Sequence, residues 1–346
     1  MNEEKQEFNL ERWFREHTFH NSEFSDLKRL VRLKKKQGIT ISLVIPALNE
    51  VKTIGTIIEC FKAELIDKYP LLDEIAVIDS GSDDGTVELS KQKGAKVFLA
   101  ERCLKEEGIY YGKGENLWKS LHLLKGDIIV WIDADIRNIH PKFVYGLIGP
   151  LLADEKIGFV KGFYKRPLKF GKKIKPTGGG RVTEICVRPL FNLFFPELSG
   201  FIQPLSGEMA GRREILESVP FFIGYGVETG LLIDISQRFG VNSMAQVDLD
   251  KRIHRNRSTV TLGKMSFGIM QAFFKRAQEL GKMDIKVDMN RVLKRSKGHE
   301  GNYELYEMEI TESERPPIRT VDKYEKRRSK SIFDYFSFKL SSVLKK

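Results

Sequence analysis

Residues 126–135 constrain the fold most, because an apolar run of β-branched and aromatic side chains ends there in two carboxylates, Asp133 and Asp135. An apolar run of this length without alternation is typical of a strand buried on both faces, as in parallel sheets. Because strand residues two apart point the same way, both carboxylates are predicted to face one side at the carboxyl end of this strand. Two such oxygen ligands suit Mg²⁺ or Mn²⁺ carrying a diphosphate. The alternative is that the pair caps the strand and begins a polar loop.

Strand-like and helix-like segments alternate on both sides of this run. Further strands are predicted over residues 39–45, 74–79, 96–99, 160–164 and 247–254. Helices are predicted over residues 87–93, 231–239 and 260–280, and another begins at Thr53. Alternation of this kind predicts an α/β fold with a mostly parallel, Rossmann-like sheet flanked by helices.

The chain of 346 residues is long enough for one large α/β domain with flanking segments. Residues 1–38 are polar and basic and are predicted to form a helical lead-in packed on the main domain. The main domain is placed at residues 39–282, with a change of pattern after residue 140. Residues 283–346 are predicted to be a basic tail, partly ordered, because the sequence there is charged and poor in aliphatic side chains.

The net charge of +11 is compatible with nucleic acid, an anionic membrane surface or acidic small substrates as partners. A basic, amphipathic stretch after residue 325 leaves peripheral membrane contact by the tail open. Nucleic-acid binding is not predicted as the function, because it would leave the carboxylate-ended strand unexplained. Three widely spaced cysteines, no signal segment and no apolar run long enough for a membrane span predict a cytoplasmic protein.

Polar loops follow the other predicted strands of the sheet. Ligands of open parallel sheets bind outside the carboxyl ends of the strands, so residues 46–50 and 80–82 are expected to face the same crevice as the two acids. Lys113 lies between Gly112 and Gly114, where it either reaches a nucleotide or remains a solvated surface lysine. Neither a P-loop nor a G-x-G-x-x-G motif is present, so no dinucleotide cofactor is predicted.

Residues 178–183 combine three glycines with Arg181 and Thr183 at the start of an apolar helix. Backbone N–H groups at a helix start and an arginine fork suit a carboxylate or phosphate, so an anion site is predicted here. The alternative is a flexible linker. Glu228 is a candidate acceptor of sugar hydroxyls or a helix-start carboxylate, and His254 either reaches the crevice or is an ordinary histidine.

Several of these motifs together resemble a known family. Residues 46–50, 79–82, Asp133-x-Asp135 and the strand end at His254 resemble nucleotide-sugar glycosyltransferases of the GT-A fold. More narrowly, the chain is similar over residues 39–280 to the glucosyl-3-phosphoglycerate synthase family. The segments that carry this narrower resemblance are residues 112–115, Tyr164-x-Arg166-Pro167, and residues 177–184, 203–208, 224–228 and 254–257.

The resemblance implies a retaining transfer of glucose from a nucleotide diphosphate sugar, UDP-glucose, to the 2-hydroxyl of 3-phosphoglycerate. It divides the domain into a nucleotide-sugar half, residues 39–140, and an acceptor half, residues 141–282. The mannosyl equivalent with GDP-mannose is the alternative. A nucleotidyltransferase is disfavoured, because the glycine- and arginine-rich first loop of that class is absent. The resemblance also implies a homodimer.

The family's functional residues map onto this sequence position by position. The nucleotide sugar would be held by Pro46, Ala47, Leu48, Glu50, Ser80, Lys113, Asp133 and Ala134. The acceptor would be held by Gly180, Arg181, Thr183 and Asn256. Asp135 and His254 would bind Mg²⁺ or Mn²⁺ on the diphosphate. The residues implied to act in catalysis are Asp135, Glu228 and Arg181.

Overall fold

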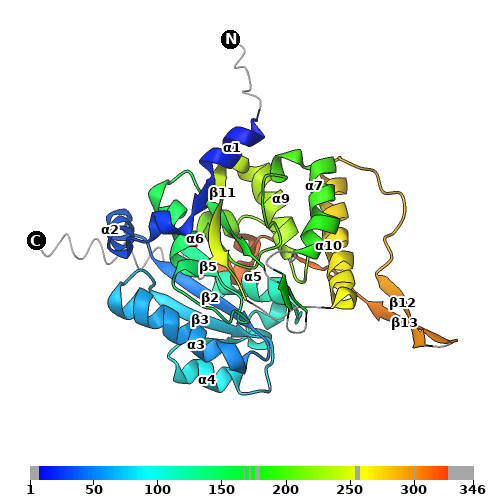
Figure 1. The fold of residues 1–346 in the computed structure, drawn as a ribbon, viewed down its shortest axis with the longest axis horizontal. Coiled ribbons are helices and arrows are strands. Elements are labelled where there is room, and N and C mark those ends of the chain that lie inside the picture. The colour runs from blue at the N-terminus through cyan, green and yellow to red at the C-terminus, as the bar shows by residue number, and fades with distance from the viewer. Residues whose placement is uncertain are drawn as a thin grey trace, which may run out of the picture.

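The computed structural model describes residues 8–166, 168–170, 173–175, 180–253, 258–299 and 301–325. Its centre is an eight-stranded sheet of order β1-β11-β6-β9-β5-β2-β3-β4, with helices on both faces (Figure 1). The strands are β1 (Thr18–His20), β2 (Ile41–Ala47), β3 (Glu74–Asp79), β4 (Lys96–Leu99), β5 (Ile128–Trp131), β6 (Phe159–Lys165), β9 (Met209–Arg212) and β11 (Met244–Lys251).

The helices follow the strands in the order expected for an α/β fold. They are α1 (Leu10–Glu16), α2 (Leu27–Gln37), α3 (Val51–Lys62), α4 (Thr86–Gln92), α5 (Lys113–Leu123), α6 (Lys142–Ala153), α7 (Arg188–Phe194), α8 (Arg213–Leu216), α9 (Val227–Phe239) and α10 (Thr259–Glu279). A π-helical turn, Thr183–Val187, precedes α7. Three two-stranded pairings complete the structure: β7 (Leu168–Phe170) with β8 (Lys173–Lys175), β10 (Phe221–Phe222) with β14 (Glu314–Arg315), and β12 (Val292–His299) with β13 (Asn302–Glu309).

The mostly parallel sheet predicted from the sequence is confirmed. Only β9 runs antiparallel, between β5 and β6, while the other neighbouring strands of the sheet are parallel. The carboxyl ends of β2, β3 and β5 therefore meet at one edge. β5 ends at Trp131, so Asp133 and Asp135 lie in the loop that follows it.

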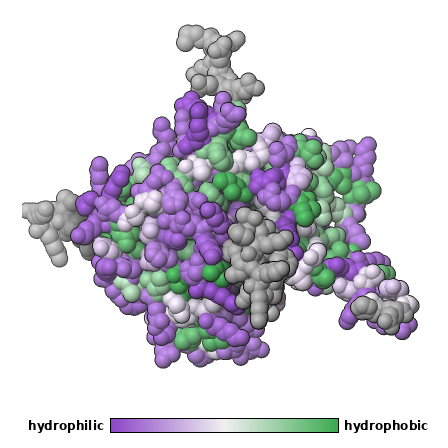
Figure 2. Space-filling view, viewed as in Figure 1, coloured by the Kyte–Doolittle hydropathy of each residue, from purple (hydrophilic) through white to green (hydrophobic). Residues whose placement is uncertain are grey.

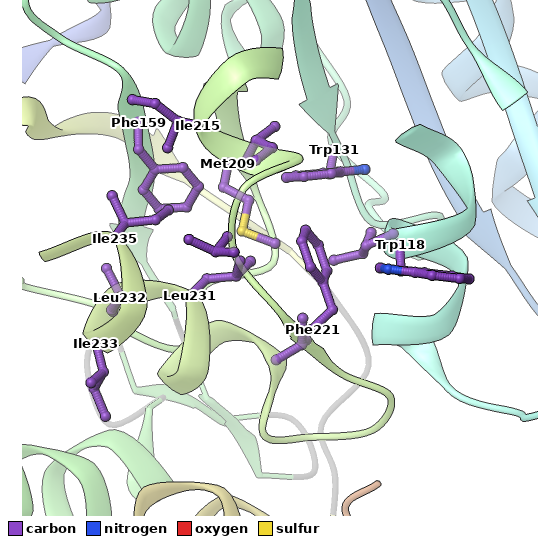
Figure 3. Packing of buried hydrophobic residues seen from close by; sticks show 14 of the residues in the cluster. Trp118, Trp131, Phe159, Met209, Ile215, Phe221, Leu231, Leu232, Ile233 and Ile235 are labelled. Atoms are coloured by element: carbon purple, nitrogen blue, oxygen red, sulfur yellow. The ribbon is translucent and has the colours of Figure 1, made fainter. Parts of the chain in front are cut away.

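Both faces of the sheet are buried, as the unbroken apolar run in residues 128–132 predicts. Ile129 and Trp131 pack in a cluster with α5, α9 and α10, whereas Ile128 and Val130 pack in a second cluster with α3 and α6. Figure 3 shows part of the first cluster, where Trp118 and Trp131 flank Phe221. This packing fixes the positions of the strand ends from which the polar loops emerge.

The segment before residue 39 contributes more than the predicted helices. Thr18–His20 form β1, which pairs in parallel with β11 at one edge of the sheet. Trp13 of α1 is 1% exposed and donates its indole N–H to the carbonyls of Val241 and Met244. The lead-in is therefore part of the sheet and of its core.

The segment after residue 282, predicted to be a tail, returns to the domain at its C-terminal end. Glu314–Arg315 pair with β10, and Ile318, Val321 and Tyr324 are buried in the cluster that contains α5. The sequence conceals this because the buried residues are few and separated by charged ones. The hairpin β12–β13 projects from the molecule (Figure 1). Residues 326–346, which carry the predicted membrane-contact stretch, lie outside the described residues.

Within the described ranges, no helix combines the length and the apolar character that a membrane crossing needs.

Candidate active site

A cavity of about 210 Å³ opens at the carboxyl edge of the sheet. Its lining comes from segments far apart in the sequence: the loop after β5, the start of α5, the turn before α7, the loop before α9 and the residue after β11. The predicted site residues among them are Lys113, Asp133, Asp135, Gly180, Arg181, Thr183 and Glu228, and Arg166, Leu205, Gly207, Tyr225 and Arg252 line it as well.

The two acids of the opening motif face one common partner, Arg252. Its Nη2 lies 3.0 Å from Asp133 Oδ2 and 2.5 Å from Asp135 Oδ1. Arg252 comes directly after β11, which ends at Lys251. In the strand order, β11 and β5 lie on opposite sides of the centre of the sheet. The acids thus converge as expected, although a loop and not strand alternation brings them together.

Lys113 is an ion-pair partner of two acids in this cavity. Its Nζ lies 2.6 Å from Asp133 Oδ1 and 3.0 Å from Glu228 Oε1. Gly207 permits this convergence, because a Cβ at that position would lie 2.2 Å from Asp133 Oδ2 and 2.4 Å from Lys113 Nζ. The family resemblance implies that Lys113 holds the nucleotide, and the structure places it between the loop after β5 and the start of α9.

A largely buried polar network adjoins the cavity and shares Arg166 and Arg252 with its lining. Tyr164 donates its hydroxyl to Glu208 Oε2 at 2.5 Å, and Arg252 Nη1 and Arg166 Nη2 each donate to the Tyr164 hydroxyl oxygen at 2.7 Å. Lys161 donates to the Ser206 carbonyl at 2.5 Å. The network holds Arg252 in place from behind, so that its Nη2 is directed at the two aspartates.

The charges of the site follow from burial and from these pairs. Burial opposes the charge on Lys113, but Asp133 and Glu228 outweigh it and raise the lysine's pKa above its usual range. Burial likewise opposes ionisation of Asp133, and Lys113 and Arg252 outweigh it and lower that carboxyl's pKa. These shifts favour the charged forms of Lys113 and Asp133 at neutral pH, which suits an electrostatic role better than proton transfer. Burial lowers the pKa of Lys161 to about 8 and raises that of Tyr164 to about 12.

The predicted nucleotide loops lie at the same edge but outside the lining of this cavity. The Ser80 backbone N–H donates to the Ala47 carbonyl at 3.0 Å, and the Ala134 carbonyl accepts from the Thr53 hydroxyl at 2.6 Å. Asn116 of α5 donates to the Ser80 hydroxyl at 2.8 Å. Burial and then the charge of Asp135 raise the pKa of Glu50. Pro46 and Leu48 belong to the same strand end, and Leu48 is 55% exposed.

Part of the predicted acceptor loop borders the cavity from the other side. Gly180 has φ +83°, and its carbonyl accepts from the Glu184 N–H at 3.0 Å. Arg181 Nη1 lies 3.3 Å from the Thr259 hydroxyl at the start of α10, and Thr183 is buried. Residues 176–179 of this loop lie outside the described ranges.

The site contains carboxylate oxygens that are suited to bind a metal ion. The side chains of Asp133 and Asp135 are 22% and 29% exposed towards the cavity, and carboxylates are suitable ligands for Mg²⁺ or Mn²⁺. Across the described ranges no group of three or more His, Cys, Asp or Glu side chains has metal-binding geometry. The predicted second ligand, His254, and the predicted acceptor residue Asn256 lie outside those ranges.

Sequence reasoning assigned no role to four residues that organise the site: Tyr164, Arg166, Glu208 and Arg252. Tyr164, Arg166 and Glu208 belong to motifs that carried the family resemblance, so the sequence did contain a signal for them. Arg252 was included in a predicted strand, residues 247–254. The sequence contained no comparable signal for Arg252, because Asp248, Asp250 and Lys251 interrupt the apolar pattern before it.

Comparison with known proteins agrees with this geometry. Residues 42–222 match the family Glycosyl transferase family 2. The chain is 55% identical over 313 residues to the glucosyl-3-phosphoglycerate synthase of Petrotoga mobilis, covering 90% of this chain and 96% of that relative. It is 44% identical over 289 residues to the enzyme of the same name from Mycobacterium tuberculosis, covering 83% and 87%.

Two solved structures share the fold over most of their length. The crystal structure of the Mycobacterium tuberculosis enzyme with Mn²⁺, UDP and glucosyl-3-phosphoglycerate has a TM-score of 0.73 at 41% identity, covering 85% of this chain and 95% of that one. The mannosyl-3-phosphoglycerate synthase of Rubrobacter xylanophilus has a TM-score of 0.83 at 36% identity, covering 90% and 99%. The chain is a glycosyltransferase that belongs to Glycosyl transferase family 2 and, within it, to the glucosyl-3-phosphoglycerate synthases.

Proposed function

We propose that the protein transfers glucose from UDP-glucose to the 2-hydroxyl of 3-phosphoglycerate with retention at the anomeric carbon. The observation that carries this proposal is that two kinds of group line one cavity. Asp133 and Asp135 suit a divalent metal ion on the donor diphosphate, and Arg181 suits an anionic acceptor. Support comes from the Mycobacterium tuberculosis relative, whose structures hold UDP-glucose and phosphoglyceric acid together with Mn²⁺.

The metal in this proposal is Mg²⁺ or Mn²⁺, held by Asp135 and His254 with Asp133 beside them. When bound, it would stabilise the charge that develops on the departing diphosphate. Pro46, Ala47, Leu48, Glu50, Ser80 and Ala134 would hold the nucleotide at the edge next to the cavity. Lys113 would contribute positive charge beside the donor, and Glu228, its partner at 3.0 Å, would accept sugar hydroxyls.

The acceptor would bind at the other side of the cavity. Its phosphate and carboxylate would be held by Arg181, by Gly180 and Thr183 of the same loop, and by Asn256. In a retaining transfer the leaving phosphate oxygen can take the proton of the attacking hydroxyl on the same face. No side-chain base behind the acceptor is then required, and positioning supplies most of the rate.

A panel of nucleotide sugars tests this function. The purified protein is incubated with 3-phosphoglycerate, Mg²⁺ and one nucleotide sugar at a time, and the nucleoside diphosphate released is measured. The highest kcat/KM is expected for UDP-glucose, with a phosphorylated glucosyl product. Turnover dependent on 3-phosphoglycerate but highest with GDP-mannose would favour the mannosyl alternative, which the likeness to the Rubrobacter xylanophilus structure supports. No release with any donor would refute the proposal.

A homodimer in the cytoplasm completes the proposal. Hydrophobic side chains lie among polar ones on the side of α7 and α10 (Figure 2), where Ile185 and Leu193 are 78% and 73% exposed. Exposed apolar side chains in one region are typical of an interface. Light scattering of the purified protein is expected to give twice the chain mass of 39.8 kDa.

A further inference from the structure

The C-terminal segment 310–315 is bonded to the loop that precedes α9. Phe221 and Phe222 pair with Arg315 and Glu314, and the Ile223 N–H donates to the Ser313 carbonyl at 2.9 Å. On the other side Gln271 of α10 donates to the Ile310 carbonyl at 2.8 Å. The segment is thus held between α10 and residues 221–226, next to the cavity.

Glu312 is the side chain of this segment that contacts the loop. Its Oε1 accepts from the Tyr225 N–H at 2.7 Å, and its Oε2 accepts from the N–H groups of Gly224 and Gly226, both at 3.2 Å. Hydrogen bonds to an ionised acceptor are stronger than those between neutral groups. Among the described residues, no lysine or arginine forms a salt bridge with Glu312. The three backbone N–H groups are therefore the main groups that stabilise its negative charge.

The surrounding sequence leaves room for this carboxylate. A Cβ at Gly224 or at Gly268 of α10 would lie 2.5 Å from Glu312 Oε1, and real Cβ atoms do not approach an oxygen so closely. Two glycines on different elements therefore clear the space that one glutamate fills. The space suits a side chain of this size, and the three backbone N–H donors suit an acceptor with two oxygens.

The loop that Glu312 holds adjoins the two helices, α5 and α9, that carry the partners of an ion pair in the cavity. Tyr225 lines the cavity, and Glu228 lies in the first turn of α9, directly after the loop. The Ile223 carbonyl accepts from the Glu115 N–H at 3.2 Å, in the first turn of α5. Lys113 at the start of α5 then meets Glu228 at 3.0 Å.

We propose that Glu312 is a positioning residue of the active site, which holds the loop 223–226 and thereby places Glu228 and Lys113 for the transfer. This inference rests on the proposed function, because its expected effect on kcat requires that the protein catalyses the transfer. It assigns a role in the reaction to a segment that the sequence set apart as a tail. Glu312 acts through the backbone of the loop and touches neither donor nor acceptor.

Glu312→Gln tests the proposal with almost no change in volume. One oxygen becomes an NH₂ group, which faces a backbone N–H donor and cannot accept from it. Hydrogen–deuterium exchange of peptides covering residues 222–230 is expected to become about tenfold faster, because charge-assisted hydrogen bonds are lost. Since misplacement of groups around the reacting atoms acts on the transition state, kcat should fall by about tenfold to a hundredfold with both KM values nearly unchanged.

Glu314→Gln is the matched control, because Glu314 lies two residues further along the same segment and pairs with Lys275 and Arg276 of α10. It should lower Tm while leaving the exchange of residues 222–230 and kcat near wild type. Equal acceleration of exchange in both variants, or none in Glu312→Gln, would overturn the proposal, as would faster exchange with unchanged kcat. Wild-type protein inactive with every nucleotide sugar would refute the proposed function instead, and exchange would still decide whether Glu312 holds the loop.

Discussion

At the residue scale, Asp135 is the carboxylate that the proposed function assigns to the metal ion. It lies beside Asp133 and faces Arg252, whose guanidinium is itself held by Tyr164. Asp135→Ala should leave the fold intact, because the aspartate follows β5 and lies in a loop, yet it should lower kcat by about two orders of magnitude or more through the loss of charge stabilisation on the leaving group. Turnover and thermal unfolding are measured together.

Removal of the metal ion with EDTA tests the same prediction independently of the substitution. It should abolish activity of the wild-type protein, and excess Mg²⁺ should restore it, while Tm of the Asp135→Ala variant stays close to that of wild type. Full turnover in EDTA would remove the metal from the proposed reaction.

Arg181 is the second residue whose role can be isolated. A hydrogen bond between arginine and an anion contributes about 1.5–3 kcal/mol, so Arg181→Ala should raise the KM for 3-phosphoglycerate by about tenfold to a hundredfold. Arg181→Lys should recover only part of this, because an ammonium lacks the planar fork. The Kd of the donor, measured without acceptor, should hardly change.

An uncharged acceptor separates recognition from support of the fold. Glycerol should be a poor substrate for the wild-type protein and should lose little more in Arg181→Ala. Equal losses with 3-phosphoglycerate and glycerol would show that Arg181 supports the fold or the donor, since its Nη1 also contacts Thr259.

At the scale of elements, the start of α5 shows why glycine flanks Lys113. A Cβ at Gly114 would lie 1.8 Å from the Phe222 carbonyl oxygen, and one at Gly112 would lie 2.3 Å from that of Ile223. Close packing of two backbones therefore accounts for both glycines. It also brings α5 and the loop before α9 together, which places Lys113 next to Glu228.

Gly114→Ala should accordingly force α5 away from β10, lower Tm and reduce kcat. The control is Gly263→Ala inside α10, where the nearest atom to a new Cβ is Arg295 Nη1 at 3.6 Å. That substitution should be neutral or stabilise the protein by up to about 1 kcal/mol through helix propensity. A Gly114→Ala variant with the Tm and kcat of wild type would contradict the close packing.

The elements differ in how well the sequence predicted them. β3 and β4 begin and end where predicted. For β3 the reason is that a strand buried on both faces has a continuous hydrophobic signal. The site was predicted in part: local motifs pointed to Lys113, Asp135 and Glu228. The partnership of Arg252 with the two aspartates was not predicted, because the partners are 117 and 119 residues apart and meet only through the order of strands in the sheet.

At the scale of the whole molecule, a buried ion cluster between α5 and β14 joins the C-terminal segment to the rest of the domain. Arg315 donates to Glu115 through two nitrogens at 2.6 and 2.7 Å, and Lys119 Nζ lies 2.9 Å from the same carboxylate. Glu115 and Lys119 are 0% exposed. The Arg315 guanidinium also lies 4.7 Å from the ring centroid of Trp118, which belongs to the core under the sheet. Loss of this arginine would therefore affect the core as well as the segment.

Arg315→Ala is expected to destabilise the whole domain, because removal of one partner from a buried ion cluster typically costs about 3–5 kcal/mol. Lys119 remains beside Glu115, so the loss should lie near the lower end, and urea unfolding followed by circular dichroism measures it. Arg319→Ala is the matched control: this arginine is exposed four residues further on, and its loss should change the free energy of unfolding by less than about 0.5 kcal/mol. If both variants unfolded at the wild-type urea concentration, the segment after residue 310 would be an appendage of the domain. A loss confined to Arg315→Ala, in one cooperative transition, would instead show that the core needs the C-terminal segment to close over α5.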